Sequence, residues 1–310
     1  MGTPEFAVAT LDALMNSNHK VVAVVTTPDK PANRGLKLQM SAVKEYAVKN
    51  NLPVLQPDKL KSEEFVSKLK EINADLFVVV AFRMLPEIVW SMPKYGTINL
   101  HASLLPQYRG AAPINWAVIN GEAETGITTF FISHQIDTGD ILLHEKIAIT
   151  EEDNAGTVHD KLMISGAALL VTTVDAIADK TVKAVPQPTF DVLKHAPKIF
   201  RDDCRIDWNK PATEVFNFIR GLSPYPGAFT ELQDDAKEKM MLKIFTTVKH
   251  LELVIPAGEF LLNAKKQAFI GCGDGALEII EIQAEGRKRM KMADFLRGFP
   301  MDEGTWQAIF

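Results

Sequence analysis

Two hydrophobic periodicities alternate along the first 180 residues. Apolar side chains that recur every three or four positions predict helices over residues 5–16, 41–49, 63–72, 111–119 and 156–177. Continuous apolar runs between them predict buried strands over residues 20–26, 75–81, 96–100, 127–132 and 141–149. Strands that alternate with helices are typical of an α/β fold, here a doubly wound, mostly parallel Rossmann-like sheet.

The periodicity ends after residue 180 and returns in a different form. Residues 181–203 contain three prolines and no regular pattern, which predicts an extended linker. Beyond it, a helix over 212–219 precedes several short strands, of the kind that build a small OB-like β-barrel. In one of these strands we expect three apolar side chains to share a face, namely Leu242, Ile244 and Val248. The predicted domains are 1–180, a linker over 181–203, and 204–310.

Composition agrees with a two-domain globular protein. The chain has 310 residues, 46% of them hydrophobic and 24% charged. A net charge of −5 argues against a polybasic coat for nucleic acid, although a local basic patch remains compatible with it. No apolar run approaches the roughly 18 residues that span a bilayer, and the first residues lack a secretory pattern. Cys204 and Cys272 have no CxxC partner. We therefore expect a cytoplasmic protein with free thiols and no membrane contact.

The chemistry concentrates in residues 98–113, INLHASLLPQYRGAAP. Asn99 and His101 end a predicted strand and share one face, because side chains alternate along a strand. Ligands bind at the carboxyl ends of parallel strands, and the following turn with Pro and Gly suits a pocket lined by backbone. A second polar loop, IDTGD, supplies Asp137.

Together these groups suit an acyl transfer. An amide can polarise a carbonyl oxygen or stabilise an oxyanion, and a carboxylate beside an imidazole can fix its tautomer and raise its basicity. Taken singly, each has an ordinary interpretation: a histidine at a strand end is usually structural, and Asn or DTGD usually forms a turn. The remaining histidines and both cysteines lack metal-ligand spacing, so we expect no metal.

Three segments in order, MGTPEFA, INLHASLLPQYRGAAPINWA and IDTGDIL, resemble the 10-formyltetrahydrofolate-dependent formyltransferases. The resemblance continues through TPDKPANRGLKL, the linker and GDGALEIIEIQAEGRKRM, and so covers nearly the whole chain. It implies that Asn99, His101 and Asp137 form a catalytic trio and that 10-formyltetrahydrofolate is the formyl donor. It also implies that the acceptor is the α-amine of initiator methionyl-tRNA, in support of translation initiation.

The resemblance also implies binding residues. Those of the reduced folate are Ser103, Leu104, Leu105 and Pro106, together with a pterin loop of Phe82, Arg83, Met84 and Leu85. Those of tRNA are Lys30, Arg34 and Lys37 in a loop over 28–39, and Arg287, Lys288 and Arg289 in the second domain. By composition alone, both basic clusters would be solvated surface.

Family members carry a short strand before the GTPEFA turn, and here Met1 falls inside that turn. A central strand missing from a doubly wound sheet would leave its neighbours unpaired. We therefore expect the native chain to begin upstream, with an apolar strand of about 5 residues.

Three alternatives stay open at this point. The acceptor could be a small amine, since such formyltransferases share the trio without needing the basic loop or the barrel. Water could replace the amine in a formyltetrahydrofolate hydrolase. A non-catalytic RNA-binding protein would leave the Asn-x-His and Asp pattern unexplained. We expect the protein to be a monomer.

Overall fold

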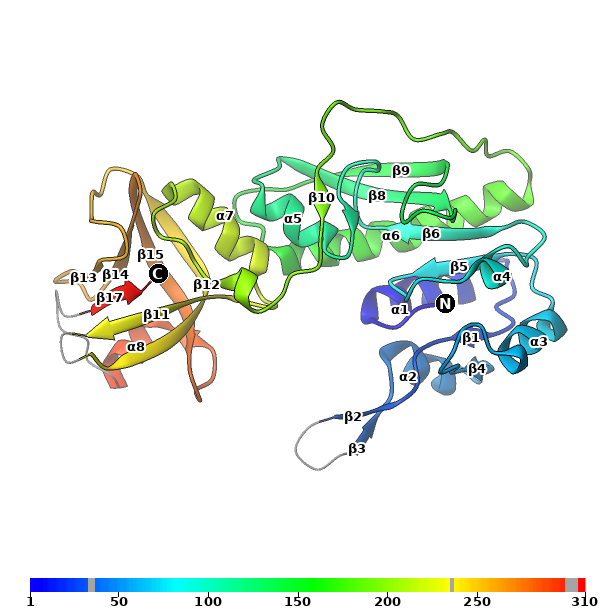
Figure 1. Cartoon of the computed structure of the whole chain (residues 1–310), viewed down its shortest axis with the longest axis horizontal. Coiled ribbons are helices and arrows are strands. Elements are labelled where there is room, and N and C mark those ends of the chain that lie inside the picture. The colour runs from blue at the N-terminus through cyan, green and yellow to red at the C-terminus, as the bar shows by residue number, and fades with distance from the viewer. Residues whose placement is uncertain (33–36, 235–236, 299–305, 310) are drawn as a thin grey trace. The chain divides into compact units, whose positions relative to one another are not determined.

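The computed structural model describes residues 1–32, 37–234, 237–298 and 306–309, which divide into two units (Figure 1). The first unit contains Met1–Gly110, Thr125–Ala148 and Asp160–His195. The second contains Ala111–Glu124, Ile149–His159 and Ala196–Phe310. Helix α5 (Pro113–Ile119) joins the second unit because it packs on α7 (Ala212–Leu222). The linear domain boundaries given above stay a prediction.

The main strands of the first unit form a sheet of parallel and antiparallel pairs, which is divided into two pieces. One piece has the order β5–β6–β8–β9, and the other pairs β1 with β4. Pairing is parallel between β1 and β4 and between β5 and β6, and antiparallel between β6 and β8. The predicted fold class is therefore confirmed. The strands are β1 (Val24–Val25), β4 (Val54–Leu55), β5 (Phe77–Val80), β6 (Thr97–His101), β8 (Glu124–Phe131) and β9 (Ile141–Ala148).

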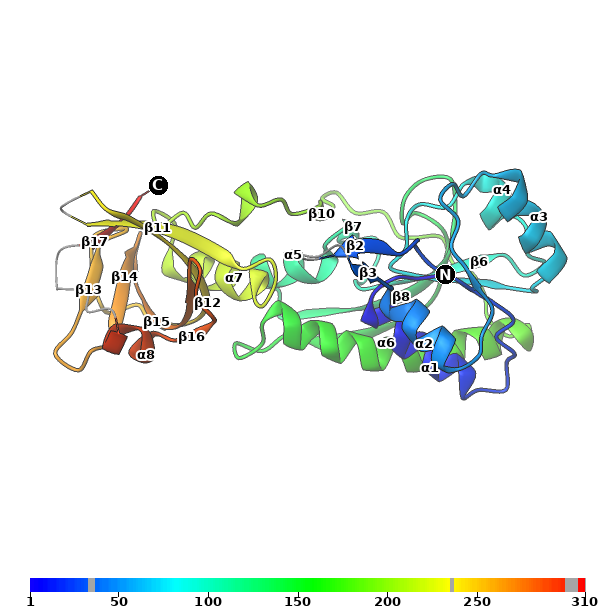
Figure 2. The ribbon, with the colours of Figure 1, turned by 90° about the horizontal axis from the view of Figure 1, so that it is seen from below.

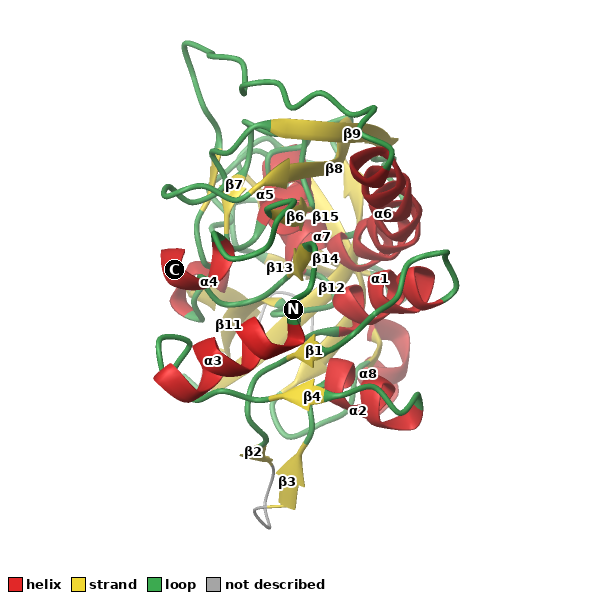
Figure 3. Cartoon of the chain, turned by 90° about the vertical axis from the view of Figure 1, so that its right-hand side faces the viewer, coloured by secondary structure: helices red, strands yellow, loops and turns green. Residues whose placement is uncertain are grey.

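Helices cover both faces of this sheet (Figures 2 and 3). On one side lie α1 (Glu5–Met15), α2 (Ala42–Lys49) and α6 (Ala155–Ala178), and on the other α3 (Glu63–Ile72) and α4 (Glu87–Trp90). By length and composition alone, α6 could cross a membrane. Its Leu162 and Leu170 are fully buried, and Gly166 lies against Leu100 and Ile127 of the sheet. The apolar composition of α6 thus serves the core of the first unit.

Strand β1 is shorter than predicted, because it covers two residues instead of residues 20–26. A strand is held by backbone hydrogen bonds to neighbouring strands, and β1 pairs with β4 at only two residues. Met1 and Gly2 lie between β1 and β5, where the Gly2 amide donates to Val25 O (3.1 Å) and the Val80 amide donates to Met1 O (2.9 Å). Only the end of the predicted strand is therefore paired.

A cavity of about 400 Å³ continues from Met1 between the two pieces of the sheet. Its walls include Leu14, Val22, Val78 and Val174. The Met1 amine donates to Val78 O at 2.7 Å, and burial lowers the pKa of this amine from 8.0 to about 5. Apolar walls beside unpaired strand edges are the surroundings that an additional strand would fill.

We expect that about five apolar β-forming residues added before Met1 raise the melting temperature, because they can pair with β1 and β5. An extension of equal length made of Gly and Ser is the control. Without an extension, the Met1 amine binds more protons in the unfolded than in the folded chain between pH 5 and 8, so its contribution makes stability fall as pH falls through that window. Either extension should remove the part of this dependence that the Met1 amine contributes. Equal melting temperatures for the two extended proteins would contradict the proposed pairing.

The second unit contains a nearly closed antiparallel barrel. Its strand order is β13–β14–β15–β12–β11–β17, with β16 beside β15, and a bridge from Glu259 to Gln307 brings the two ends of this path together. Helices α7 and α8 (Met292–Gly298) pack on its core around Trp208. The strands are β11 (Ala228–Asp234), β12 (Lys239–His250), β13 (Phe260–Leu262), β14 (Ala268–Cys272), β15 (Gly275–Ala284), β16 (Met290–Lys291) and β17 (Trp306–Ile309).

One prediction for this barrel was wrong. Leu242 and Ile244 are buried, but Val248 is 45% exposed. The register between β12 and β15 shifts between Ile244 and Thr247, and such an irregularity reverses which face later residues occupy. The alternation in the sequence therefore could not be extended across the bulge.

Candidate functional site

Strand β6 places the two polar residues of the first motif on one face of the sheet. Ile98 and Leu100 are buried, and Leu100 faces α6 through its contact with Gly166. Because side chains alternate along a strand, Asn99 and His101 project from the opposite face. His101 is only 7% exposed.

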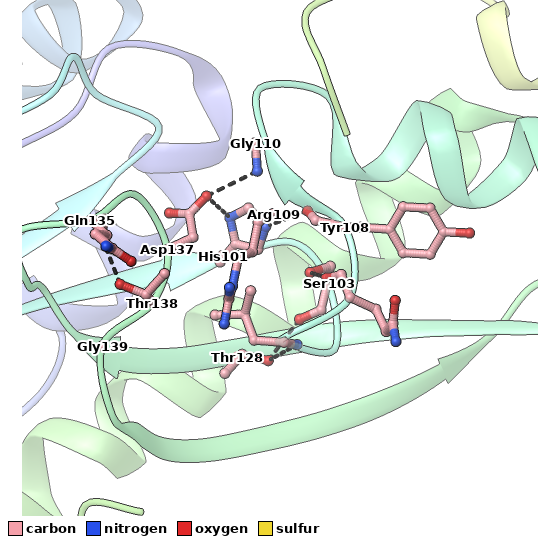
Figure 4. Close-up of polar contacts among 12 residues, drawn as sticks. His101, Ser103, Tyr108, Arg109, Gly110, Thr128, Gln135, Asp137, Thr138 and Gly139 are labelled. Carbon is pink, nitrogen blue, oxygen red and sulfur yellow. Dashed lines mark hydrogen bonds and ion pairs between the residues drawn. The ribbon is translucent and has the colours of Figure 1, made fainter. Parts of the chain in front are cut away.

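The imidazole of His101 lies between a backbone carbonyl and a carboxylate (Figure 4). Its Nε2 is 2.9 Å from Tyr108 O, and its Nδ1 is 3.8 Å from Asp137 Oδ2. A carbonyl can only accept, so this contact places a proton on Nε2. Nδ1 is left facing Asp137 at a separation that suits an ion pair when Nδ1 is also protonated. Tyr108, rather than Asp137, therefore fixes the tautomer.

Asp137 reaches His101 through a loop that folds back over the sheet. The loop leaves β8 where the Ile132 amide donates to Thr97 O, at the end of β6 away from His101. The carboxylate of Asp137 is 13% exposed, and its Oδ2 accepts the Gly110 amide at 3.0 Å (Figure 4). Asp137 itself has φ of 54°, in the left-handed region. Backbone geometry thus determines where this carboxylate lies.

The predicted folate residues after β6 are mostly buried. Ser103 is fully buried, and its hydroxyl donates to Gln107 O at 2.6 Å. Leu105 and Pro106 are buried as well, and the Leu105 amide donates to Thr128 Oγ1 at 3.2 Å. Thr128 in turn donates to Ser103 O (Figure 4). These internal bonds give the segment a defined shape next to His101.

The predicted pterin loop follows β5, the parallel neighbour of β6, and so begins at the same edge of the sheet as His101. Met84 is 69% exposed, whereas Leu85 is 5% exposed and belongs to the core. Phe82 packs on the same core, and the Arg83 guanidinium donates to the carbonyls of Pro57 and Asp58. Met84 is the side chain of this loop that is open to a ligand.

The basic loop predicted over residues 28–39 is a hairpin of β2 (Lys30–Ala32) and β3 (Lys37–Gln39). Lys30 is exposed, the backbone of Lys37 pairs with Ala32, and Arg34 lies outside the described residues. The acid of this segment, Asp29, is paired with Lys44 at 2.6 Å, which holds the pKa of the carboxyl below its usual value.

The second basic cluster is partly engaged within the barrel. Arg289 pairs with Glu281 at 2.5 Å and lies over the Phe245 ring. Arg287 lies over the Phe295 ring, and Lys288 is exposed. Both arginines therefore contact side chains of the barrel.

Two residues at the site were not predicted from the sequence, because they contact the side chains through their backbone. Tyr108 and Gly110 contribute a carbonyl and an amide, which carry no side-chain signal. The Pro- and Gly-containing turn predicted a pocket lined by backbone, but not which groups would line it. Among the described residues, no group of three or more His, Cys, Asp or Glu side chains could hold a metal ion.

Comparison with known proteins shows the family to which this chain belongs. Residues 1–183 match the family model described as formyl transferase, and residues 198–300 match the formyl transferase C-terminal domain. The chain belongs to the formyl transferase family. It is 54% identical to the methionyl-tRNA formyltransferase of Bacteroides thetaiotaomicron, over 98% of this chain and 96% of that one. Identity to the Flavobacterium johnsoniae enzyme of the same name is 49%, over 98% and 96% of the two chains.

Solved structures agree with the fold. An N-formyltransferase from Helicobacter canadensis, in complex with folinic acid and dTDP-3-aminofucose, superposes with a TM-score of 0.63 at 22% identity. That match covers 93% of this chain and 97% of that one. HypX from Aquifex aeolicus, in complex with tetrahydrofolic acid, gives 0.57 at 19% identity, over 85% of this formyltransferase and 47% of HypX. At these identities the likeness concerns the fold alone.

Replacing Gly139 with alanine should move the Asp137 loop. A Cβ at this position would lie 1.7 Å from Phe131 O, a backbone atom that cannot turn aside. We expect formylation activity to fall at least about tenfold, because misplacing a catalytic group by 1 Å can cost about 100-fold. Gly298→Ala is the control, since no described atom lies within 4 Å of a Cβ there. Wild-type activity in Gly139→Ala would show that the loop position does not matter.

Proposed function

We propose that this protein transfers a formyl group from 10-formyltetrahydrofolate to the α-amine of initiator methionyl-tRNA. The observation that carries the proposal is the identity of 54% over nearly the full length of a methionyl-tRNA formyltransferase, barrel domain included. The same reaction suits a site in which an amide, an imidazole and a carboxylate converge. The acceptor amine is itself the nucleophile, so the protein has no acyl group to carry.

The residues present fit a formyl donor at this edge of the sheet. Met84 offers an exposed apolar surface in the loop after β5, and the internally bonded segment after His101 forms a firm wall. Met84 and the backbone around it would contact the pterin ring, while Ser103, Leu104, Leu105 and Pro106 shape the wall. When bound, the folate supplies a formyl group on N10.

Each member of the trio then has a task at a stated atom. The Asn99 amide and the His101 Nδ1–H stabilise the negative charge that develops on the formyl oxygen. Nε2 donates to Tyr108, so Nδ1, which also faces Asp137, is the ring nitrogen that remains for this task. Asp137 stabilises the protonated imidazole and helps the proton of the amine to reach the leaving nitrogen. A carbon–nitrogen bond to the amine forms as the bond to N10 breaks.

The basic hairpin would bring the acceptor stem of tRNA to this site. Lys30, Arg34 and Lys37 are the proposed contacts, and the pairing of Asp29 with Lys44 leaves them without opposition from that carboxylate. In the barrel, the exposed Lys288 fits phosphate contact better than Arg289, which is held by Glu281.

We expect His101→Ala and Asp137→Asn to lower single-turnover formylation at least about 100-fold, the usual loss for an acid–base or oxyanion group. Melting temperatures should change little, because these polar side chains contribute less to stability than core packing does. Single-turnover rates close to that of the wild type in either variant would exclude this mechanism.

For Arg34→Ala we expect weaker formylation with unchanged folate binding. Losing one phosphate contact should flatten the dependence of log affinity on log salt by roughly one unit or slightly less. If Arg34 reads a base instead, selectivity between initiator and elongator tRNA should fall as well. The measurement is kcat/KM on both tRNAs at several salt concentrations, with exposed Lys59→Ala as control. Equal values for Arg34→Ala and the wild type throughout would exclude a tRNA function for this residue.

A further inference from the structure

The segment that follows α6 contributes one side chain to the neighbourhood of Asp137. Val185 pairs with Ile141 through two backbone hydrogen bonds of 2.8 and 2.9 Å, which fixes the path of the segment beside β9. Over residues 183–190, every side chain is exposed except that of Gln187. Gln187 is half-buried because its amide is directed at the loop between β8 and β9.

Both ends of the Gln187 amide are engaged. Its Nε2 donates to Asp137 O at 2.8 Å and to Gly139 O at 2.9 Å. Its Oε1 accepts from Arg109, at 2.6 Å from Nη2 and 3.2 Å from Nε. These contacts need a side chain that donates two hydrogen bonds and accepts from Arg109 at the same time. Glutamate lacks the donors, lysine lacks the acceptor and methionine lacks both.

These contacts join the two segments that determine where the Asp137 carboxylate lies. One segment is the turn at Asp137, whose left-handed backbone is uncommon for a residue with a side chain. The other is β7 (Arg109–Gly110), whose Gly110 amide binds Asp137 Oδ2. A single amide thus holds the turn from its carbonyl side and also holds the strand that binds the carboxylate.

We propose that Gln187 is a positioning residue for the transfer reaction, which sets Asp137 opposite His101 Nδ1 through the turn and β7. It touches neither the reacting atoms nor His101, and it acts only through Asp137. The inference rests on the proposed function of Asp137.

The test is a steady-state comparison of Gln187→Met with the wild type, using methionyl-tRNA and 10-formyltetrahydrofolate. We expect kcat to fall about 10- to 100-fold, as for a misplaced catalytic group, while both KM values change less than about twofold. Gln187→Glu keeps an acceptor for Arg109 but turns an oxygen toward two carbonyls, so it should lose at least as much. Gln267→Met is the matched control, because Gln267 is a half-buried glutamine of the barrel whose amide binds Glu278.

A double-mutant cycle separates positioning from a general structural effect. If Gln187 acts through Asp137, then Gln187→Met should cause no further loss in an Asp137→Asn background. Additive losses, or a kcat within about twofold of the wild type, would overturn the inference. If Gln187→Met lowers the melting temperature, the cycle is run with Gln187→Glu. Failure of the wild type to formylate methionyl-tRNA would instead count against the proposed function.

Discussion

Strand β6 is the constraint on which the rest of the first unit depends. Its even-numbered residues, Ile98 and Leu100, pack into the core, while Asn99 and His101 project from the other face. A shift of one residue in its pairing with β5 or β8 would exchange the two sets. Burial of two aliphatic side chains therefore fixes, at the same time, the face from which the polar pair emerges. The register of β6 therefore sets both the packing of the core and the position of the polar pair.

The site is completed by groups that are not side chains. The Tyr108 carbonyl holds His101, and the Gly110 amide holds Asp137. Both belong to the segment that leads from β6 to the end of β7, and Tyr108 has φ of 59°, in the left-handed region. Such backbone conformations persist only where the surroundings over-determine them, as the buried hydroxyl of Ser103 and the main-chain bonds of this segment do. The pair of ionisable groups is thereby preorganised before any substrate arrives.

The two units follow different rules of construction. The first buries a mixed sheet between helices. The second closes an antiparallel sheet nearly into a barrel and thereby protects its edges. Its exposed basic residues divide into those held by an acid, as Arg289 is by Glu281, and those in the turn after β15, as Lys288. A count of charges in the sequence cannot make this division, because it depends on which acid lies across the sheet.

The sequence by itself determined the fold class, most helices, and the juxtaposition of Asn99 and His101, since periodicity and strand alternation are local properties. It also predicted Asp137 as their partner, through the resemblance to a family. Only the tertiary structure decided that Asp137 is 3.8 Å from Nδ1, that Val248 turns outward beyond a bulge, and that the Gln187 amide binds the turn at Asp137. Those outcomes depend on backbone groups and register between segments distant in the chain. Backbone groups are the same at nearly every position, so a sequence carries no record of which of them will meet.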